Sequence, residues 1–333
     1  MSVSGGLILG IESSCDDTAA AVVDGEGNVL SSVVATQTHI HSRYGGVFPE
    51  FASRAHALTI IPAIERALAE ANTDGPSLKA IGVTRGPGLI GSLIVGLNTA
   101  AGLGLGWKVP VIGINHLRGH LRSADLEERR VHLPALILLV SGGHTFLARM
   151  ESTTSIQLLG STRDDSVGEA YDKVGRLLGL GYPGGPAVDR LAATGTASIP
   201  FPRPMLTEGL EFSFSGLKSA VSRYMSDNPD FEKADVAASF VSACMDVLLT
   251  KCRRALVAYP SASLVVVGGV SASPQLRAGA KELCDGLGVS LCLPPLRWST
   301  DNAAMIGLAA WDYLRAGVRP ELRPTAALPI TEF

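Results

Sequence analysis

Residues 7–24 read LILGIESSCDDTAAAVVD, an apolar run, a polar turn and a second apolar run. This pattern is typical of a β-hairpin with buried strands. The same order returns at 135–150, ALILLVSGGHTFLARM, and each copy opens a segment that later becomes helical in pattern. A third apolar run, within 264–277, predicts a buried strand that ends at a glycine turn and enters a helix. The repetition predicts a duplicated α/β unit rather than one continuous sheet.

The length of the chain also favours two lobes. At 333 residues it exceeds the roughly 250–300 residues at which a single core stops growing. We expect a first lobe at 1–113 and a second at 114–333, whose C-terminal helix packs back on the first. Apolar spacing predicts helices at 51–71, 92–106, 233–258 and 301–316, and the proline-containing segment after Gly317 is predicted to be a tail.

Charge and cysteine content limit the class of protein. The net charge is −3, so a polyanion would have to find a local basic face. The cysteines are odd in number and form no C-x-x-C pair, which indicates reduced thiols. We find no basic leader and no stretch read as a membrane span, and we therefore expect a cytoplasmic protein.

The segment NHLRGH, residues 115–120, holds the clearest candidate for metal chemistry. His116 and His120 are four residues apart, so on a helix they share a face and can chelate one ion. Surface or capping histidines would have the same spacing, and a third ligand is needed to decide. A metalloprotease helix would carry Glu after the first His, but Leu117 stands there, which disfavours peptide hydrolysis.

A carboxylate that could complete the set lies in WSTDNAAMIG, residues 298–307. Here Ser299 or Thr300 is predicted to cap a helix with Asp301 in its first turn. Favourable interaction with the helix dipole would explain Asp301 equally well unless a cation lies nearby. Two histidines and one carboxylate would leave coordination positions open, as in a catalytic rather than a structural site.

Three glycine turns are candidates for nucleotide binding: LVSGGHT at 139–145, YPGGPAVD at 182–189 and VGGVSAS at 267–273. Glycines let backbone amides approach a phosphate. On a duplicated α/β scaffold these turns resemble the actin, Hsp70 and sugar kinase superfold, in which two lobes close over a nucleotide. We therefore expect a cleft between the lobes.

A series of motifs runs in order from residue 10 to about 307. The motifs are GIESSCDDT, HSRYGGVFPEFASRAH, TRGPGLIGSLIVG, NHLRGH, LVSGGHT, GEAYDKVGRLLGLGYPGGP, FSFSGLK, GGVSAS and STDNAAMIG. Together they resemble the TsaD family, also called the universal Kae or glycoprotease-like family. The resemblance implies transfer of a threonylcarbamoyl group from threonylcarbamoyl-AMP to adenosine 37 of transfer RNAs that read codons beginning with A. It also implies one iron or zinc ion, a TsaB-like dimerisation paralogue and a TsaE-like ATPase as partners.

The resemblance assigns residues by position. It implies that His116, His120 and Asp301 bind the metal, and that the substrate is bound by Leu139, Val140, Ser141, Gly142, Gly143, Asp172, Gly185, Asp189 and Ser273. The chain departs from the family pattern twice. Arg118 stands where H-x-E-G-H has Glu, and Ser273 stands where an Asn would bind the nucleotide, which puts that nucleotide contact in doubt.

Acidic and basic residues supply the remaining candidates. Glu12, Asp16 and Asp17 line the first hairpin turn and could orient a metal-bound water or take a proton, with Glu12 and Asp16 our candidate catalytic residues; solvated turn carboxylates are the alternative. Candidate transfer RNA contacts are Arg43, Arg54, Arg85, Arg118, Arg122, Arg129 and Arg130, for which a solvated basic face is the alternative.

Two other functions are compatible with such a fold. A kinase of the same superfold would need an acidic base facing a hydroxyl and would not need the paired histidines. A non-catalytic scaffold paralogue would keep the fold and lose the metal ligands, whereas His116, His120 and Asp301 are all present here.

Overall fold

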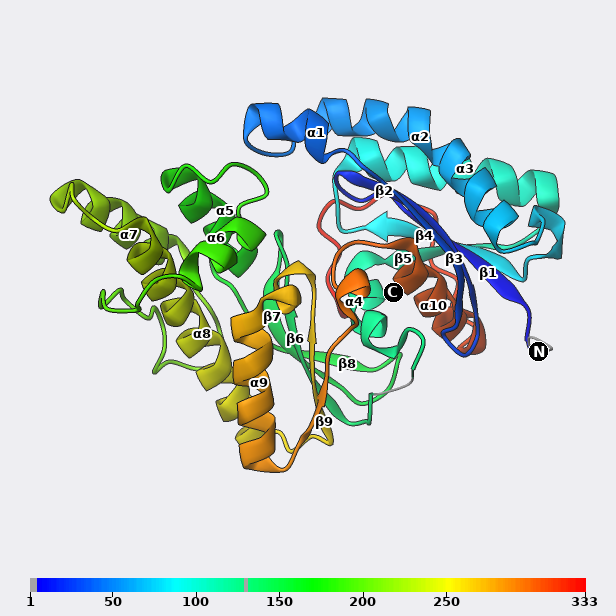
Figure 1. The fold of residues 1–333 in the computed structure, drawn as a ribbon. Helices are drawn as coiled ribbons and strands as arrows, with labels where there is room; N and C mark the ends of the chain where they lie inside the picture. The colour runs from blue at the N-terminus through cyan, green and yellow to red at the C-terminus, as the bar shows by residue number, and fades with distance from the viewer. Residues whose placement is uncertain (1–4, 129–130) are drawn as a thin grey trace. The chain divides into compact units, whose positions relative to one another are not determined.

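The structure is a computed structural model that describes residues 5–128 and 131–333. It divides into two compact units. Unit 1 comprises residues 1–130, 153–155 and 294–333, and unit 2 comprises 131–152 and 156–293. Each unit is built around one five-stranded sheet within the described residues (Figure 1).

The sheet of unit 1 has the order β3-β2-β1-β4-β5. β1 pairs antiparallel with β2 and parallel with β4, and β4 pairs parallel with β5. The carboxyl ends of β1, β4 and β5 therefore meet at one edge of this sheet. The strands are β1 (Leu7–Glu12), β2 (Asp17–Asp24), β3 (Val29–Thr36), β4 (Ala80–Gly86) and β5 (Val111–Asn115).

Helices cover both faces of this sheet because successive apolar side chains along its strands point to opposite faces, which makes both faces apolar. Leu9 and Ile11 pack with the helices α2 (Pro49–Glu70) and α3 (Ile90–Trp107), whereas Ile8 packs with α10 (Ala303–Arg315) (Figure 1). Gly10 permits the close approach of α10, since a Cβ there would lie 2.0 Å from the carbonyl oxygen of Ala303. Shorter helices of unit 1 are α1 (Thr38–His41), α4 (His116–Arg122) and the 3-10 turns η1 (Ser42–Tyr44), η2 (Gly75–Ser77), η3 (Ser123–Asp125) and η5 (Leu296–Trp298).

Unit 2 repeats the same topology with the order β10-β9-β6-β7-β8. Its central strand β6 pairs antiparallel with β7 and parallel with β9. Leu136, Leu138 and Val140 of β6 face a core formed with the helices. The elements are β6 (Ala135–Val140), β7 (Thr145–Met150), β8 (Ile156–Ser161), β9 (Ser263–Val267), β10 (Ser290–Cys292), α5 (Val167–Leu177), α6 (Gly185–Ala192), α7 (Ser215–Asp227), α8 (Lys233–Ala258), α9 (Pro274–Leu287) and η4 (Gly269–Ala272).

The expected duplicated α/β fold is confirmed by the equivalence of the two sheets. In each, a hairpin (β1–β2 or β6–β7) is followed by a third antiparallel strand on one side and two parallel strands on the other. The predicted helices correspond to α2, α3, α8 and α10.

The units divide the chain differently from the boundary expected at 113/114. Residues 114–130 and 294–333 belong to unit 1. The physical reason is packing: α4 directly follows β5 of this sheet, and α10 is buried against β1, β2 and β4. The segment after Gly317 is also no free tail, because Leu328 and Ile330 are buried.

Helix α3 is long and apolar enough, by length and composition alone, to cross a membrane. The core helix of a soluble protein passes the same test, and one side of α3, including Leu93 and Leu97, is buried against its own unit. Ile90, Ile94 and Leu105 are exposed. The helix predicted at 92–106 corresponds to α3, but its length and composition were not recognised as sufficient for a membrane span.

Candidate metal centre

The helix α4 presents both histidines, and its start is set by Asn115. The side chain of Asn115 accepts a hydrogen bond from the backbone N–H of Leu117 at 3.0 Å, which caps the helix as it leaves β5. His116 and His120 lie one turn apart with their rings edge to face, 4.7 Å between centroids. The helical spacing predicted from NHLRGH is therefore present.

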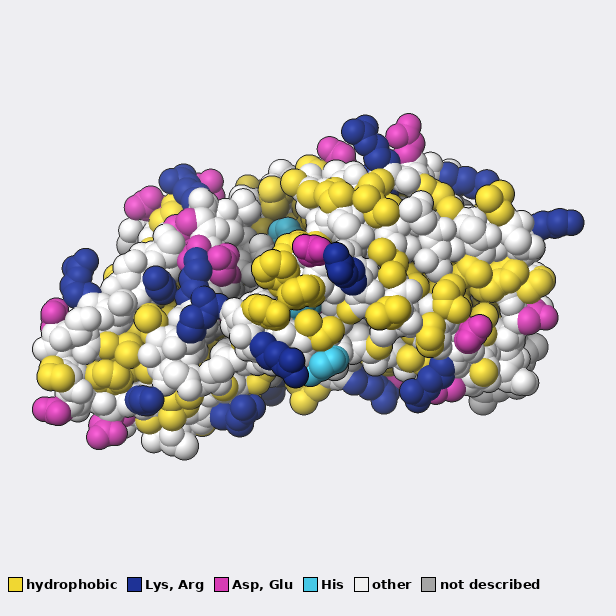
Figure 2. All heavy atoms as spheres, turned by 90° about the horizontal axis from the view of Figure 1, so that it is seen from above, with side chains coloured by type: hydrophobic (Ala, Val, Ile, Leu, Met, Phe, Trp, Pro, Cys, Tyr) yellow, Lys and Arg dark blue, Asp and Glu magenta, His cyan; other side chains and the backbone are white. Residues whose placement is uncertain are grey.

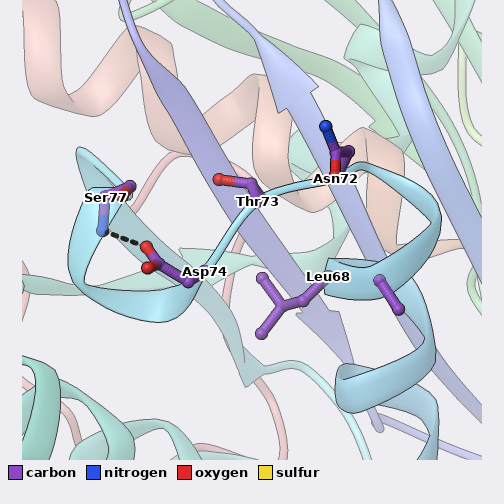
Figure 3. A pocket seen from close by; sticks show the side chains of 6 residues that line it. Leu68, Asn72, Thr73, Asp74 and Ser77 are labelled. Carbon is purple, nitrogen blue, oxygen red and sulfur yellow. Dashed lines mark hydrogen bonds between the residues drawn. The ribbon is translucent and has the colours of Figure 1, made fainter.

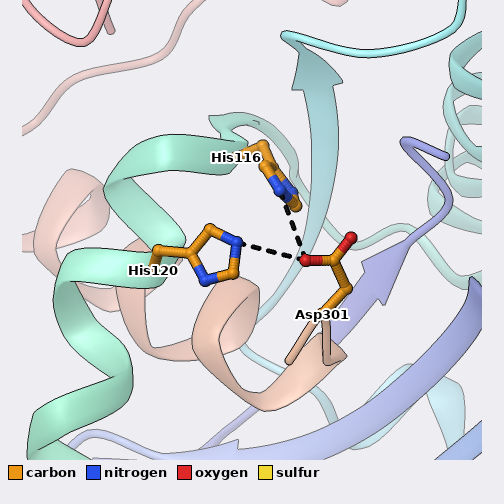
Figure 4. Close-up of side chains that lie close together, drawn as sticks. All are labelled: His116, His120 and Asp301. Carbon is orange, nitrogen blue, oxygen red and sulfur yellow. Dashed lines mark ion pairs between the residues drawn. The ribbon is translucent and has the colours of Figure 1, made fainter. Parts of the chain in front are cut away.

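Asp301 joins the two histidines from the far end of the sequence (Figure 4). Its Oδ1 lies 3.1 Å from Nε2 of His120 and 3.6 Å from Nε2 of His116. Gly119 of α4 lies against α10, since a Cβ there would come 2.7 Å from Cδ1 of Ile306. The predicted cap is wrong in one detail: Asn302 caps α10 by accepting from the N–H of Met305, so Asp301 precedes the helix rather than sitting in its first turn.

These three residues fit a divalent metal ion. One ligand atom of each lies within 4.8 Å of the other two. Metal bonds of about 2.1 Å place neighbouring ligand atoms of a tetrahedron about 3.4 Å apart, close to the two separations above. His120 is almost fully buried, yet within the described structure neither of its ring nitrogens meets the geometry of a hydrogen bond. A buried imidazole in that state is costly unless another group binds it.

Glu12 is not a solvated turn carboxylate. It ends β1, is fully buried, and its Oε2 lies 2.9 Å from Nδ1 of His116. Burial alone would raise the pKa of Glu12, but the adjacent His116 outweighs burial and lowers it. Burial likewise disfavours the His116 imidazolium, but the charges of Glu12 and Asp301 prevail and raise the pKa of His116 to about 9.

Asp16 lies in the first hairpin turn and Asp17 begins β2, and both are partly buried. Burial raises the pKa of Asp16 above its usual value. Burial, followed by repulsion from Asp16, raises the pKa of Asp17 to about 6. The two carboxyl groups thus differ from Glu12, since neither is fully enclosed.

Several candidate RNA contacts have other partners. Arg118 is buried, and its guanidinium donates to the carbonyl oxygens of Ile330, Thr331 and Thr153. Arg122 is also buried and pairs with Asp125 and Asp312. Predicting these two as RNA contacts was therefore wrong. Arg54 pairs with Glu50 on the surface of α2, and Arg129 and Arg130 lie outside the described residues.

The first loop that the family resemblance assigns to substrate binding follows β6 in unit 2. Leu139 and Val140 are fully buried at the end of β6, where they pair with Phe146 and Thr145 of β7. Gly142 and Gly143 face open space at their missing Cβ positions. Because β9 runs parallel to β6, with Val267 beside Leu139, the loop after β9 emerges at the same sheet edge.

The other residues that the family resemblance assigns to substrate binding lie on α5, on α6 and after β9. Asp172 accepts a hydrogen bond from the N–H of Gly184 at 2.8 Å, which fixes the glycine turn before Gly185. Burial raises the pKa of Asp189, and the nearby hydroxyl groups of Ser273 and Tyr171 only partly offset it. Ser273 therefore belongs to this polar cluster although an Asn is usual there.

A surface hollow of about 360 Å³ follows α2 and carries no comparable chemistry (Figure 3). It is lined by Leu68, Ala69, Asn72, Thr73, Asp74 and Ser77. The Asp74 carboxylate caps η2 by accepting from the N–H of Ser77 at 3.0 Å. We assign no site to this hollow.

Sequence reasoning missed the residues that support the ligands. Ser14, Thr84 and Gly119 act through contacts between segments far apart in the chain. Only Gly119 had a local signal, as the small residue within NHLRGH.

The duplicated sheets define the class of protein: an actin-, Hsp70- and sugar-kinase-like fold, here with a buried two-histidine, one-carboxylate cluster in unit 1. A crystal structure of full-length HypF in the phosphate- and nucleotide-bound form matches with a TM-score of 0.64 at 12% identity, covering 93% of this chain and 46% of that one. Component A of the Acidaminococcus fermentans (R)-2-hydroxyglutaryl-CoA dehydratase matches with a TM-score of 0.56 at 16% identity, covering 93% and 100%. These likenesses confirm the fold.

The particular family follows from sequence. Residues 28–308 match the TsaD family, described as tRNA N6-adenosine threonylcarbamoyltransferase. The chain is 49% identical over 320 residues to the protein of that name from Salinibacter ruber, covering 93% of this chain and 95% of that protein. It is 45% identical over 318 residues to the one from Bacillus subtilis, covering 94% and 92%. The chain belongs to this family of transferases.

Proposed function

We propose that this protein transfers threonylcarbamoyl from threonylcarbamoyl-AMP to N6 of adenosine 37 in transfer RNAs that read codons beginning with A. The observation that carries the proposal is the convergence of His116, His120 and Asp301 in a chain of this family. A scaffold paralogue without metal ligands would not need this cluster, and a kinase would not need the paired histidines.

One iron or zinc ion is the cofactor we propose, held by Nε2 of both histidines and by the Asp301 carboxylate. Imidazole nitrogen and carboxylate oxygen suit either metal. When bound, the ion supplies a Lewis acid that can polarise the carbamoyl oxygen. The protein contributes a rigid, buried pair of histidines, so that little reorganisation accompanies the reaction.

The donor adenylate is assigned to the loops of unit 2. Open backbone at Gly142, Gly143 and Gly185 leaves room for a phosphate and a ribose, and backbone N–H groups in such turns attract anions. Ser141, Asp172, Asp189 and Ser273 are the polar side chains we propose for donor contacts. With a good leaving group already on the donor, orientation of the acceptor amine is the remaining task.

Proton removal from the adenine amine is assigned to Asp16 rather than to Glu12. A general base must reach the proton it removes, and the fully buried Glu12 is already hydrogen-bonded. Asp16 is partly exposed, and burial raises its pKa toward the range useful for proton transfer.

Transfer RNA, a TsaB-like paralogue and a TsaE-like ATPase complete the proposed cytoplasmic system. Arg43 and Arg85 remain candidate RNA contacts. Exposed apolar side chains on α2 and α3 are a suitable face for the paralogue, since such patches mark protein interfaces (Figure 2); they are Leu58 and Ile61 on α2 and Ile90, Ile94 and Leu105 on α3.

Reconstitution tests the reaction directly. The protein, synthetic threonylcarbamoyl-AMP, unmodified transfer RNA and both partner proteins are combined, and the modified nucleoside is measured by mass spectrometry. We expect product with the wild type and a loss of both bound metal and product with His120→Ala. Replacement of the exposed His39 by Ala is the matched control and should change neither. Full transfer after exhaustive chelation would contradict the metal assignment, and no product at all would contradict the reaction.

A further inference from the structure

The Glu12 carboxylate is held by three separate segments of unit 1. Its Oε1 accepts from the N–H of Ser14 at 2.6 Å, and its Oε2 accepts from the Thr84 hydroxyl at 2.6 Å. Oε2 also lies 2.9 Å from Nδ1 of His116. These contacts exist because β1, β4 and β5 end at the same sheet edge, so that Glu12, Thr84 and the start of α4 come together.

The contact determines which nitrogen of His116 is free. An ionised carboxylate only accepts hydrogen bonds, so Nδ1 carries the proton that faces Glu12. The Ser14 hydroxyl lies farther from Nδ1, at 3.3 Å, and as a neutral group it competes weakly. In the neutral imidazole, the form that binds a metal, the lone pair of His116 therefore resides on Nε2, the atom that faces Asp301.

We propose that Glu12 is a positioning residue for the metal centre, which fixes the ring orientation and the tautomer of His116 without touching substrate. The proposal rests on the metal site of the proposed function. Metal-binding histidines commonly donate their second N–H to a carboxylate, and loss of that partner weakens metal affinity. Glu12, Thr84 and Ser14 thus form the supporting layer behind one ligand, while His120 has no such partner among the described residues.

Glu12→Gln is the variant that tests this role, because it keeps the size of the side chain and removes its charge. The affinity of the metal-free full-length protein for Zn²⁺ is measured by competition with a chromophoric chelator. We expect a roughly 10- to 100-fold weaker affinity than in the wild type. Glu50→Gln, on the exposed surface of α2, is the charge-matched control and should bind like the wild type.

A spectroscopic readout separates positioning from general loss of structure. With Co²⁺ in place of Zn²⁺, the visible bands report ligand geometry, and we expect them to shift in Glu12→Gln but not in Glu50→Gln. If Glu12→Gln does not fold, Thr84→Val removes one donor to Glu12 and should still weaken Zn²⁺ affinity measurably. If Glu12→Gln folds, wild-type Zn²⁺ affinity together with an unchanged Co²⁺ spectrum overturns the positioning role. If Glu12→Gln does not fold, wild-type Zn²⁺ affinity in Thr84→Val overturns it. A wild-type protein that binds no ion contradicts the metal site itself.

Discussion

At the scale of single residues, Asp16 and Asp17, where the first hairpin turn meets β2, are neighbouring carboxylates whose charges work against folding at neutral pH. Burial and the charge of Asp16 raise the pKa of Asp17 to about 6, against an ordinary value of 3.8. The folded state therefore binds the Asp17 proton more tightly than the unfolded chain does. The resulting stabilisation is complete below about pH 4 and is lost as the pH rises through about 6.

Asp17→Asn should remove this pH dependence. At pH 7.5 we expect the variant to be more stable than the wild type by about 2 to 3 kcal/mol, the equivalent of the pKa shift. At pH 4.5 the difference should shrink, because wild-type Asp17 is then largely protonated. Urea unfolding at both pH values measures the effect. An equal difference in the free energy of unfolding at pH 4.5 and pH 7.5 would show that Asp17 does not carry this ionisation.

The residues of the site were predictable to different degrees. The spacing of His116 and His120 indicated a possible chelating pair with Asp301 as a candidate third ligand, and the resemblance to a family selected these three residues as the metal ligands. The contact between Glu12 and His116 was not predictable, because it depends on two strand ends that are brought together only by the order of the sheet. Arg118 was misread as a surface residue, since a basic side chain in a polar helix gives no local sign of burial.

At the scale of elements, the final segment of the chain is bound to α4, the helix that carries His116 and His120. Arg118 of α4 donates to the carbonyl oxygens of Ile330 and Thr331, and its guanidinium lies 4.1 Å from the centre of the Phe333 ring. Asn115 adds hydrogen bonds to the carbonyl oxygens of Pro329, at 2.8 Å, and Glu332, at 3.0 Å. Arg118, which stands where the family pattern H-x-E-G-H has Glu, therefore binds the C-terminal segment.

Arg118→Met should release this segment. The side chain would still fill space, but it would leave carbonyl groups without a charged donor, which we expect to lower the free energy of unfolding by roughly 2 to 3 kcal/mol. Limited proteolysis should cut within residues 323–333 sooner than in the wild type. Arg66→Met, which removes an exposed ion pair with Glu70, should change stability by less than about 0.5 kcal/mol. Equal behaviour of the two variants would argue against the fastening.

The elements themselves followed from the sequence where their period was clear. The helix predicted at 233–258 is α8 without change of bounds, because its apolar spacing persists over many turns. Strand β3 was not predicted, since VLSSVVAT mixes Ser with apolar residues on a half-exposed edge of the sheet. The start of α10 was misplaced because Ser299, Thr300 and Asn302 are all acceptable caps, and only Asn302 has the required geometry.

At the scale of the whole molecule, duplication separates two tasks. The cluster of His116, His120 and Asp301 lies within unit 1, and the residues assigned to the donor lie within unit 2. The duplicated hairpins were predictable from two similar stretches of sequence. The position of the boundary was not, because α4 directly follows β5 and stays with the first sheet, which no feature of the sequence marks.

Gly185→Trp tests whether these tasks are separable. A Cβ at Gly185 meets no atom within 4 Å, so the bulky ring should fit without disturbing unit 2. It would instead occupy the space assigned to the adenylate, and we expect at least tenfold weaker binding of a non-reactive donor analogue, or about 1.4 kcal/mol, by calorimetry. The Zn²⁺ content should stay at the wild-type level, because the ligands belong to unit 1. Gly286→Trp on α9, where the Cβ position is equally open, is the control and should leave both quantities unchanged. Wild-type analogue binding by Gly185→Trp would remove this turn from the donor site, and a parallel loss of Zn²⁺ would show that the two units do not hold their ligands independently.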